Sequence, residues 1–362
     1  MRIVAHNGAR ILGGAERATT LLMSGLQSRG HDVLMLCNDR HVTDYAKASG
    51  VPARVSVIGG DISFLSTRRF GSALSDFKPD ALIVGTWKKL FMASWAAKQK
   101  RVRSVIARVG LETDTPRNAK YRVALRQWTD AVVVNSERMI EPFASLDGFG
   151  ASRVRMIHNG VAAPRRIGNR GAMRKSLGID ERARVIGTVA RLATQKRIDR
   201  LLRVVAKLPA DIHCVVAGDG GERQNLARLG ASLGITQRLH FVGHREEKSE
   251  VLDAMDLFVV TSDKEGLSNA MLEAMAFGLP VVSTPVSGSA EALRADVHGS
   301  RPGIVSGFTE GELERDINAL MNDSTRLAAA GDAARKRAES DFSIEIMLDR
   351  WEAALAAPTP GR

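Results

Sequence analysis

Two glutamates with seven residues between them, Glu265 and Glu273, stand in the segment 262–291 of this 362-residue sequence. The apolar run LFVVTS ends just before them, and the pattern predicts a helix that opens near Ser268, with Ser268 or Asn269 as its cap. A helix N-terminus at the carboxyl end of a parallel strand attracts anions, because unpaired N–H groups and the helix dipole point at the ligand. The segment therefore predicts a phosphate site.

Glu273 would lie about 7 Å along that helix, since it follows Ser268 by five residues and each residue rises about 1.5 Å. From there its carboxylate can accept hydrogen bonds from ribose hydroxyls while phosphates occupy the helix end. Gly278 and Pro280 stop the helix and start the next strand. Taken alone, the pair of glutamates is uninformative, and the glycine and proline positions around it carry the interpretation.

Strand-like apolar runs alternate with helical stretches along nearly the whole chain, which is typical of parallel sheets covered on both faces. Eleven such runs are many for one open sheet, so we expect an α/β protein with two Rossmann-like domains. The expected strands are Ile3–Ala5, Val33–Leu36, Ala81–Val84, Ser104–Ala107, Ala131–Val134, Val185–Val189, His213–Ala217, Leu239–Val242, Leu257–Val260, Pro280–Ser283 and Gly303–Val305.

The domain boundary is expected within 158–176, where Pro, Gly and Arg replace the periodic apolar residues. This gives an N-terminal domain over 1–163 and a C-terminal domain over 164–341. The last segment, 342–357, contains the amphipathic pattern of one more helix.

The net charge of +12 is unevenly shared between these halves. Residues 1–163 carry 24 Lys and Arg against 13 Asp and Glu, whereas residues 164–362 carry 28 against 27. The first half is therefore expected to meet something anionic. Its segment 88–103 has six basic residues, no acidic ones, and two aromatic residues, Phe91 and Trp95. Such a helix can lie on an anionic membrane, or it can pack on the sheet with a solvated basic face.

Several classes of protein are disfavoured by the composition. No run of about 18 apolar residues exists, so no bilayer-spanning helix is expected. The N-terminus reads as a buried strand and not as a signal peptide. Cys37 and Cys214 sit in apolar runs, which is typical of free thiols in a reducing compartment, so a cytoplasmic location is expected. Neither an Asp-x-Asp motif nor a cluster with metal-ligand spacing is present, and we expect no metal and no cofactor.

The segment EGLSNAMLEAMAFGLPVVST (265–284) resembles the signature of the retaining GT-B glycosyltransferases of family 4, also called group 1. Four other segments resemble motifs of this family in the family's order: GGAER (13–17), HNGV (158–161), GTVARLATQKRID (187–199) and VVAGDGGER (215–223). The resemblance implies a GT-B fold, with two Rossmann-like domains facing across a cleft and the C-terminal helix crossing back to the N-terminal domain. It also implies a nucleotide-diphosphate sugar as donor, with UDP the commonest family choice.

The resemblance further implies catalytic roles for Glu265, Arg191 and Lys196. Arg191 and Lys196 would face the donor diphosphate and stabilise the charge that develops on the leaving group, without a metal. Glu265 would hold hydroxyls of the donor sugar, and Glu273 would bind the ribose.

Other residues are implied as contacts of the donor. The backbone of Gly266, Leu267 and Ser268 would reach the sugar or the β-phosphate. Gly13 and Gly14 would let a first-domain loop approach the diphosphate, because a side chain would obstruct it. Gly243 would lie near the base.

One departure from the family concerns the first domain. The family often places a histidine there, near the donor sugar, but this sequence has none between His41 and His158. The corresponding strand ends read VGTWKK (84–89) and ARVGLE (107–112). The front-face mechanism implied for the family needs no protein nucleophile, so activity is still expected. The acceptor-side candidates are Thr86, Trp87, Lys88, Arg108 and Glu112.

Three other functions fit the sequence less well. A nucleotide-sugar epimerase of GT-B fold needs acid and base groups around the sugar, which the histidine-poor first domain disfavours. A dinucleotide-dependent oxidoreductase is disfavoured because no Gly-x-Gly-x-x-Gly opens the first helix. A basic nucleic-acid-binding protein rests on charge alone, and only two tyrosines are available for stacking. The expected acceptor is instead an anionic or lipid-linked glycan, such as a lipopolysaccharide core, at the inner face of a membrane.

Overall fold

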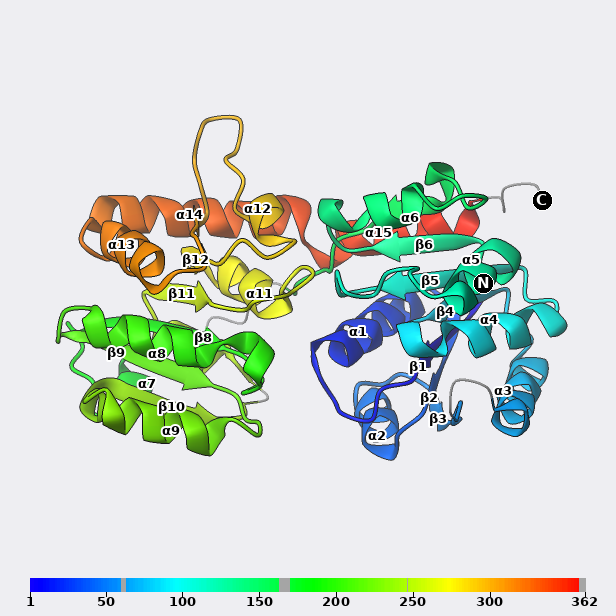
Figure 1. The fold of residues 1–362 in the computed structure, drawn as a ribbon, viewed down its shortest axis with the longest axis horizontal. Coiled ribbons are helices and arrows are strands. Elements are labelled where there is room, and N and C mark those ends of the chain that lie inside the picture. The colour runs from blue at the N-terminus through cyan, green and yellow to red at the C-terminus, as the bar shows by residue number, and fades with distance from the viewer. Residues whose placement is uncertain (60–62, 163–169, 246, 358–362) are drawn as a thin grey trace. The chain divides into compact units, whose positions relative to one another are not determined.

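A computed structural model describes residues 1–59, 63–162, 170–245 and 247–357. It divides into two compact units (Figure 1). The first unit contains Met1–Gly160 and the C-terminal segment from Ile344, and the second contains Val161–Ser343. The chain therefore passes from one unit to the other twice, after Gly160 and after Ser343. Each unit consists of a parallel sheet with helices on its faces, as the alternating pattern of the sequence predicts.

The sheet of the first unit has the strand order β3-β2-β1-β4-β5-β6-β7, and every pairing in it is parallel. All five strands predicted for this half are present. The two others, β3 and β7, are three residues long and have an arginine in the middle, so no apolar run stands out there. The strands are β1 (Arg2–Asn7), β2 (Asp32–Cys37), β3 (Ala53–Val55), β4 (Ala81–Val84), β5 (Ser104–Val109), β6 (Ala131–Val134) and β7 (Val154–Met156).

Helices connect these strands and bury their apolar sides on the sheet. The main helices of the first unit are α1 (Gly14–Ser28), α2 (Arg40–Ala48), α3 (Phe64–Phe77), α4 (Leu90–Gln99), α5 (Ala119–Trp128), the short α6 (Glu141–Ala144) and the C-terminal α15 (Ile344–Ala356). Single 3-10 turns lie at Trp87–Lys89, Glu137–Met139 and Ala151–Arg153.

The last helix, α15, packs on the first unit, which confirms the predicted return of the C-terminal helix (Figure 1). Trp351 is fully buried in the cluster that contains Ile3 and Leu22 of β1 and α1. Gly160 makes the approach possible, because a Cβ atom there would lie 2.9 Å from Cα of Ile344.

The basic segment 88–103 forms the end of a 3-10 turn and helix α4. Leu90 is fully buried, and the ring of Phe91 meets that of Trp128 edge-on at 5.0 Å between centroids. Lys98 lies 3.7 Å from the buried carboxylate of Asp130. These contacts favour the second interpretation of the segment, a helix packed on the sheet with a solvated basic side.

The sheet of the second unit has the order β10-β9-β8-β11-β12-β13, again with parallel pairings. Its strands are β8 (Arg184–Val189), β9 (Ile212–Ala217), β10 (Leu239–Gly243), β11 (Leu257–Val260), β12 (Val281–Ser283) and β13 (Gly303–Val305). Its helices are α7 (Arg170–Ser176), α8 (Ile198–Lys207), α9 (Arg223–Ser232), α10 (Ser249–Asp253), α11 (Asn269–Phe277), α12 (Ser289–Ala292), α13 (Glu310–Met321) and α14 (Ser324–Asp341), with 3-10 turns at Thr194–Lys196 and Thr236–Arg238.

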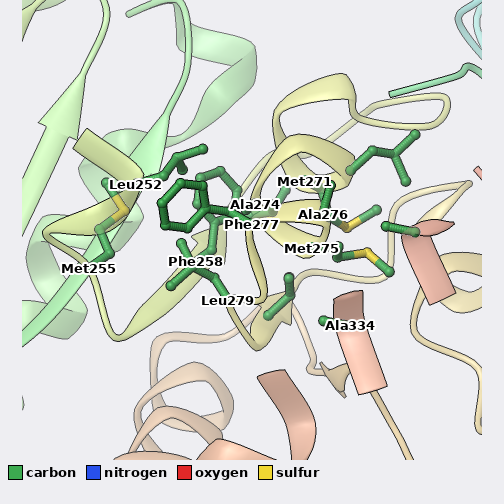
Figure 2. Close-up of a cluster of buried hydrophobic side chains, with 14 of the residues drawn as sticks. Leu252, Met255, Phe258, Met271, Ala274, Met275, Ala276, Phe277, Leu279 and Ala334 are labelled. Atoms are coloured by element: carbon green, nitrogen blue, oxygen red, sulfur yellow. The ribbon is translucent and has the colours of Figure 1, made fainter. Parts of the chain in front are cut away.

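Helix α11 lies at the centre of one core of this unit. Figure 2 shows Met271 and Met275 of α11 among buried neighbours that include Phe258 of β11 and Ala334 of α14. Because α11 is buried on most sides, its first turn and the loop before it are held rigidly. This is the helix that the sequence predicts to begin at a phosphate site.

Candidate active site

The switch point of the second sheet lies between β8 and β11. From β8 the chain winds outward to β9 and β10 on one side, and β11, β12 and β13 extend the sheet on the other. In open α/β sheets, ligands bind at the carboxyl ends of the strands where the order reverses in this way. The loop after β8 carries Arg191 and Lys196, and the loop after β11 carries Glu265. The fold thus brings three predicted catalytic residues to one place.

Lys196 and Glu265 are in direct contact across this switch point. The ammonium Nζ of Lys196 donates to Oε1 of Glu265, and Ser262 Oγ donates to the same oxygen at 2.8 Å. The Glu265 side chain is only 10% exposed. Its second oxygen, Oε2, has no hydrogen-bond partner among the residues that the structure describes. The carboxylate is therefore anchored by one oxygen and can accept a ligand hydroxyl with the other.

Arg191 differs from the cations around it because it is exposed and pairs with no other side chain in the described part of the chain. Arg197 and Arg200, by contrast, both hold Asp263, at 3.1 and 2.7 Å. Burial by itself would raise the pKa of Asp263, but the hydrogen bonds from these two arginines outweigh it and lower that pKa. Arg197 also pairs with Asp199 at 3.1 Å, so both arginines are paired with carboxylates within the fold, whereas Arg191 is open to solvent.

The Gly-Asp-Gly motif after β9 allows close approach of two main-chain segments. A Cβ atom on Gly218 would lie 1.9 Å from the carbonyl oxygen of Ala190, and one on Gly220 would lie 2.3 Å from that of Leu192. Both glycines have positive φ, 128° and 154°, and Leu192 N donates to Asp219 O at 2.8 Å. These glycines therefore fix the loop that carries Arg191.

The loop from Glu265 to Ser268 is supported from behind by residues 284–289. Gly288 N donates to Gly266 O at 3.0 Å, and a Cβ atom on Gly288 would lie 2.7 Å from Cα of Leu267. Leu267 itself is buried. Ser268 is the N-cap of α11, and its side chain accepts from Met271 N at 3.4 Å. The predicted donor-binding backbone of Gly266, Leu267 and Ser268 is therefore a rigid turn that leads into a capped helix.

Glu273 lies on α11 and pairs with a residue that the sequence analysis missed. Lys248 Nζ donates to both of its carboxylate oxygens, at 2.7 and 2.6 Å. Both side chains are partly exposed, so a ligand can reach them. The charged run REEK after β10 was the available signal, but nothing local says which of its charges faces α11. Gly243, at the end of β10, has φ 71° and accepts from Gly218 N at 2.7 Å through its carbonyl.

The switch point of the first sheet lies between β1 and β4, and its loops hold the predicted glycines. Gly13 is the extended N-cap residue of α1, and Gly14 is the first helical residue. The carboxylate of Glu16 accepts from Gly13 N at 2.9 Å, so Glu16 caps the helix. Thr86, after β4, accepts from Gly8 N at 2.8 Å and joins the two loops.

Among the acceptor-side candidates, Trp87 and Arg108 make internal contacts. The Trp87 ring is buried, with centroids 4.8 Å from Tyr121 and 5.6 Å from Phe143. The Arg108 guanidinium donates to Thr19 Oγ1 and to Asn159 Oδ1, both at 2.9 Å. Burial lowers the pKa of Arg108 to about 10, which leaves it charged at neutral pH.

Of the other two candidates, Lys88 and Glu112, the first lies near the carboxyl group of Asp114, which the sequence analysis did not single out. Lys88 is exposed and Glu112 is partly buried. Burial raises the pKa of Asp114 to about 6, against the opposing effect of the Lys88 charge. Asp114 is thus an acid of nearly neutral pKa beside the predicted acceptor-side residues.

Comparison with known proteins assigns this arrangement to a family. A model of the glycosyl transferases group 1 matches residues 169–337, and a model of the glycosyl transferase 4-like domain matches residues 13–160. The chain belongs to the group 1 glycosyltransferases. Four of the five motifs quoted from the sequence lie within these two regions, and HNGV (158–161) crosses the end of the first.

Individual relatives of this glycosyltransferase include a D-inositol 3-phosphate glycosyltransferase of Mycobacterium sp. (strain KMS), which is 35% identical over 53% of the chain. That match covers 45% of the relative, so the chain aligns with less than half the length of this protein. The lipopolysaccharide core biosynthesis glycosyltransferase LpsE of Rhizobium meliloti is 30% identical over 63% of the chain and 65% of the relative.

A solved structure confirms the GT-B fold. Alr3699/HepE of Anabaena, in complex with UDP and glucose, matches with a TM-score of 0.85 at 21% identity and covers 98% of this chain and 99% of its own. Within the described residues of this glycosyltransferase, no helix has both the length and the hydrophobicity needed to cross a membrane. No group of three or more His, Cys, Asp or Glu side chains in those residues is arranged to hold a metal ion.

Proposed function

We propose that the protein transfers a sugar from a nucleotide-diphosphate sugar, with a UDP-sugar favoured, to a hydroxyl group of an acceptor, with retention at the anomeric carbon. The observation that carries this proposal is the contact between Lys196 and Glu265 at the switch point, beside the unpaired Arg191. Cations and a carboxylate in this arrangement suit a ligand with a diphosphate at one end and sugar hydroxyls at the other.

In the proposed reaction, the bond between the anomeric carbon and the phosphate oxygen breaks, and a bond from that carbon to the acceptor oxygen forms on the same face. The departing phosphate takes the proton of the acceptor hydroxyl. Arg191 and Lys196 stabilise the negative charge that builds on the leaving nucleoside diphosphate. Glu265 accepts hydrogen bonds from the sugar through its open oxygen, and Ser262 holds the other oxygen in place.

The nucleoside end of the donor is assigned to Glu273. Its carboxylate, oriented by Lys248, would accept hydrogen bonds from the ribose hydroxyls while the diphosphate lies at the N-terminus of α11. Gly243 at the end of β10 stays the candidate for contact with the base, and Gly13 and Gly14 stay candidates for contact with the diphosphate from the first unit.

The proposed acceptor is an anionic or lipid-linked glycan of a bacterial cell surface, such as a lipopolysaccharide core, met in the cytoplasm at the inner face of the plasma membrane. The excess of basic residues in 1–163 supports this choice, as do the names of the relatives, which act on an inositol phosphate or in lipopolysaccharide core biosynthesis.

A thermal-shift panel of UDP-, GDP- and ADP-sugars tests the donor. A ligand that binds the folded state alone raises the melting temperature, so at least one donor class should do so. UDP-sugars are expected to give the largest shift. If none of the nucleotide sugars moved the transition, the proposed function would be wrong.

A further inference from the structure

A basic groove lies on the surface of the first unit, between α5 and the segment that contains α6. It has a volume of about 580 Å³. Three arginines line it, Arg117 just before α5 and Arg122 and Arg126 on α5, whereas Asp147 is its only acidic lining residue. None of these residues belongs to the donor site proposed above.

Two of the arginines, Arg122 and Arg126, lie on the same face of helix α5. Arg122 and Arg126 are four residues apart, which places their Cβ atoms about 5–6 Å from each other and makes their repulsion unfavourable. Neither Arg117 nor Arg122 has a side-chain hydrogen bond or ion pair within the described ranges. Arg122 therefore faces Arg126, and no carboxylate of the described residues is paired with Arg122.

Arg126 is held in place by main chain and not by a carboxylate. Its Nε donates to the carbonyl oxygen of Asp147 at 2.5 Å. The turn that presents this carbonyl continues through Gly148, whose φ of 69° favours glycine. The anchor uses one of five N–H groups, so the two terminal nitrogens of the guanidinium stay able to donate to a ligand.

The groove has the size and the chemistry of a site for a phosphate ester. Its volume lies in the range of about 300–1,000 Å³ that is usual for small-ligand sites, which exceeds the needs of a lone phosphate ion. Guanidinium groups bind phosphate oxygens in a bidentate manner, and the hydroxyl of Thr115 on the lining can donate to a remaining oxygen or to a sugar hydroxyl.

We propose that Arg117, Arg122 and Arg126 bind a phosphate ester of the acceptor substrate. The inference rests on the proposed function and specifies it: the acceptor carries a phosphate group, and the groove recognises that group away from the hydroxyl that receives the sugar. It also gives a location to part of the positive charge that distinguishes the first half of the chain.

The test uses the full chain and the double variant Arg122→Gln/Arg126→Gln. Arg68→Gln/Arg69→Gln is the matched control, because these exposed residues of α3 remove the same charge from the same unit. Glucose 6-phosphate is titrated at constant ionic strength and its binding is measured by calorimetry. Loss of two charge-assisted contacts should weaken binding by about tenfold or more, with the control unchanged.

A second arm identifies the source of the phosphate. Co-sedimentation is measured with vesicles of phosphatidylcholine alone and with vesicles that contain an equal amount of phosphatidylglycerol. Binding to glucose 6-phosphate that the double variant loses assigns the groove to a soluble phosphorylated sugar. Binding only to the anionic vesicles, again lost in the double variant and kept in the control, assigns it to a phospholipid or glycolipid headgroup.

Two outcomes would overturn the proposal: neither probe binds the wild-type chain, or the double variant binds the probe as tightly as the control variant does. Failure of the proposed function is recognised separately, by the thermal shift with UDP-sugars. The double variant should keep that shift in full, because its substitutions lie outside the second unit.

Discussion

Lys248 Nζ lies 2.7 and 2.6 Å from the two carboxylate oxygens of Glu273, and Lys196 contacts the other glutamate of the same motif, Glu265. Each glutamate thus pairs with a lysine from another loop: Lys248 lies after β10 and Lys196 lies after β8. The surroundings differ, because Glu265 is nearly buried and Glu273 is partly exposed. If Glu265 contacts the donor sugar and Glu273 the ribose, as proposed, the first contact should be rigid and the second adjustable.

Glu273→Ala is expected to raise KM for the donor by roughly 10- to 100-fold with little change in kcat, because hydrogen bonds to a charged group are lost equally in the ground and transition states. Steady-state kinetics with a varied UDP-sugar measure this. Glu250→Ala, on the exposed side of α10, is the control. Lys248→Met should raise KM in the same direction and Lys248→Arg should restore it, whereas a fall in kcat alone would argue against the ribose assignment.

Glu265→Ala is expected to act on turnover instead. Removing the carboxylate leaves Lys196 without its partner. It also removes the group that would accept hydrogen bonds from the donor sugar, so kcat should fall by roughly 100-fold. Donor binding, measured by thermal shift, should change little. A donor affinity that fell as much as kcat would contradict a role for Glu265 specific to the transition state.

Arg191→Gln should leave the free energy of unfolding unchanged, since this exposed guanidinium has no side-chain partner in the described residues. It should lower kcat/KM by roughly 100-fold if the charge stabilises the leaving diphosphate. Arg182→Gln makes the same change at another exposed position of the second unit. Equal activity of the two variants would remove Arg191 from the proposed mechanism.

The class of fold could be read from the sequence because its signals are local. Apolar runs such as Val185–Val189 and Leu257–Val260 alternate with helical patterns, and this alone predicts parallel sheets. Strand order is different, because it depends on pairings between distant segments. The position of the switch point between β8 and β11 follows only from the assembled sheet.

The distinction between local signals and contacts of distant segments also applies to the site. Motifs within one loop, such as the turn from Glu265 to Ser268, were visible as residue types in sequence. Lys248 was not, because its role depends on how the loop after β10 meets α11. Asp114 was missed because its raised pKa results from burial, which no neighbouring residue in the sequence indicates.

The raised pKa of Asp114 predicts that the free energy of unfolding depends on pH. Its pKa is about 6 in the folded chain and 3.8 in the reference state, so the folded state binds more protons between these values. The stability due to this group is therefore fully present below about pH 3.8 and is lost as the pH rises through about 6. Asp114→Asn should be more stable than the wild type at pH 7, on the order of 1 kcal/mol after allowance for solvent screening, and equal to it near pH 4. Urea unfolding at both pH values measures this, and the exposed Asp76→Asn is the control; a stability difference that did not grow with pH would contradict the assignment.

Gly218→Ala tests whether the Gly-Asp-Gly motif is needed for the backbone conformation of the loop or for direct contact with the ligand. A Cβ atom at Gly218 would lie 1.9 Å from Ala190 O and would impose a φ of 128° on alanine, so the loop that carries Arg191 has to move. We expect a loss of about 3 kcal/mol or more in the free energy of unfolding, together with weaker donor binding. Gly221→Ala is the matched control, because its Cβ atom would meet nothing within 4 Å. If Gly218→Ala kept wild-type stability and lost only donor binding, the glycine would act through direct contact with the ligand, and the structural account of the motif would be wrong.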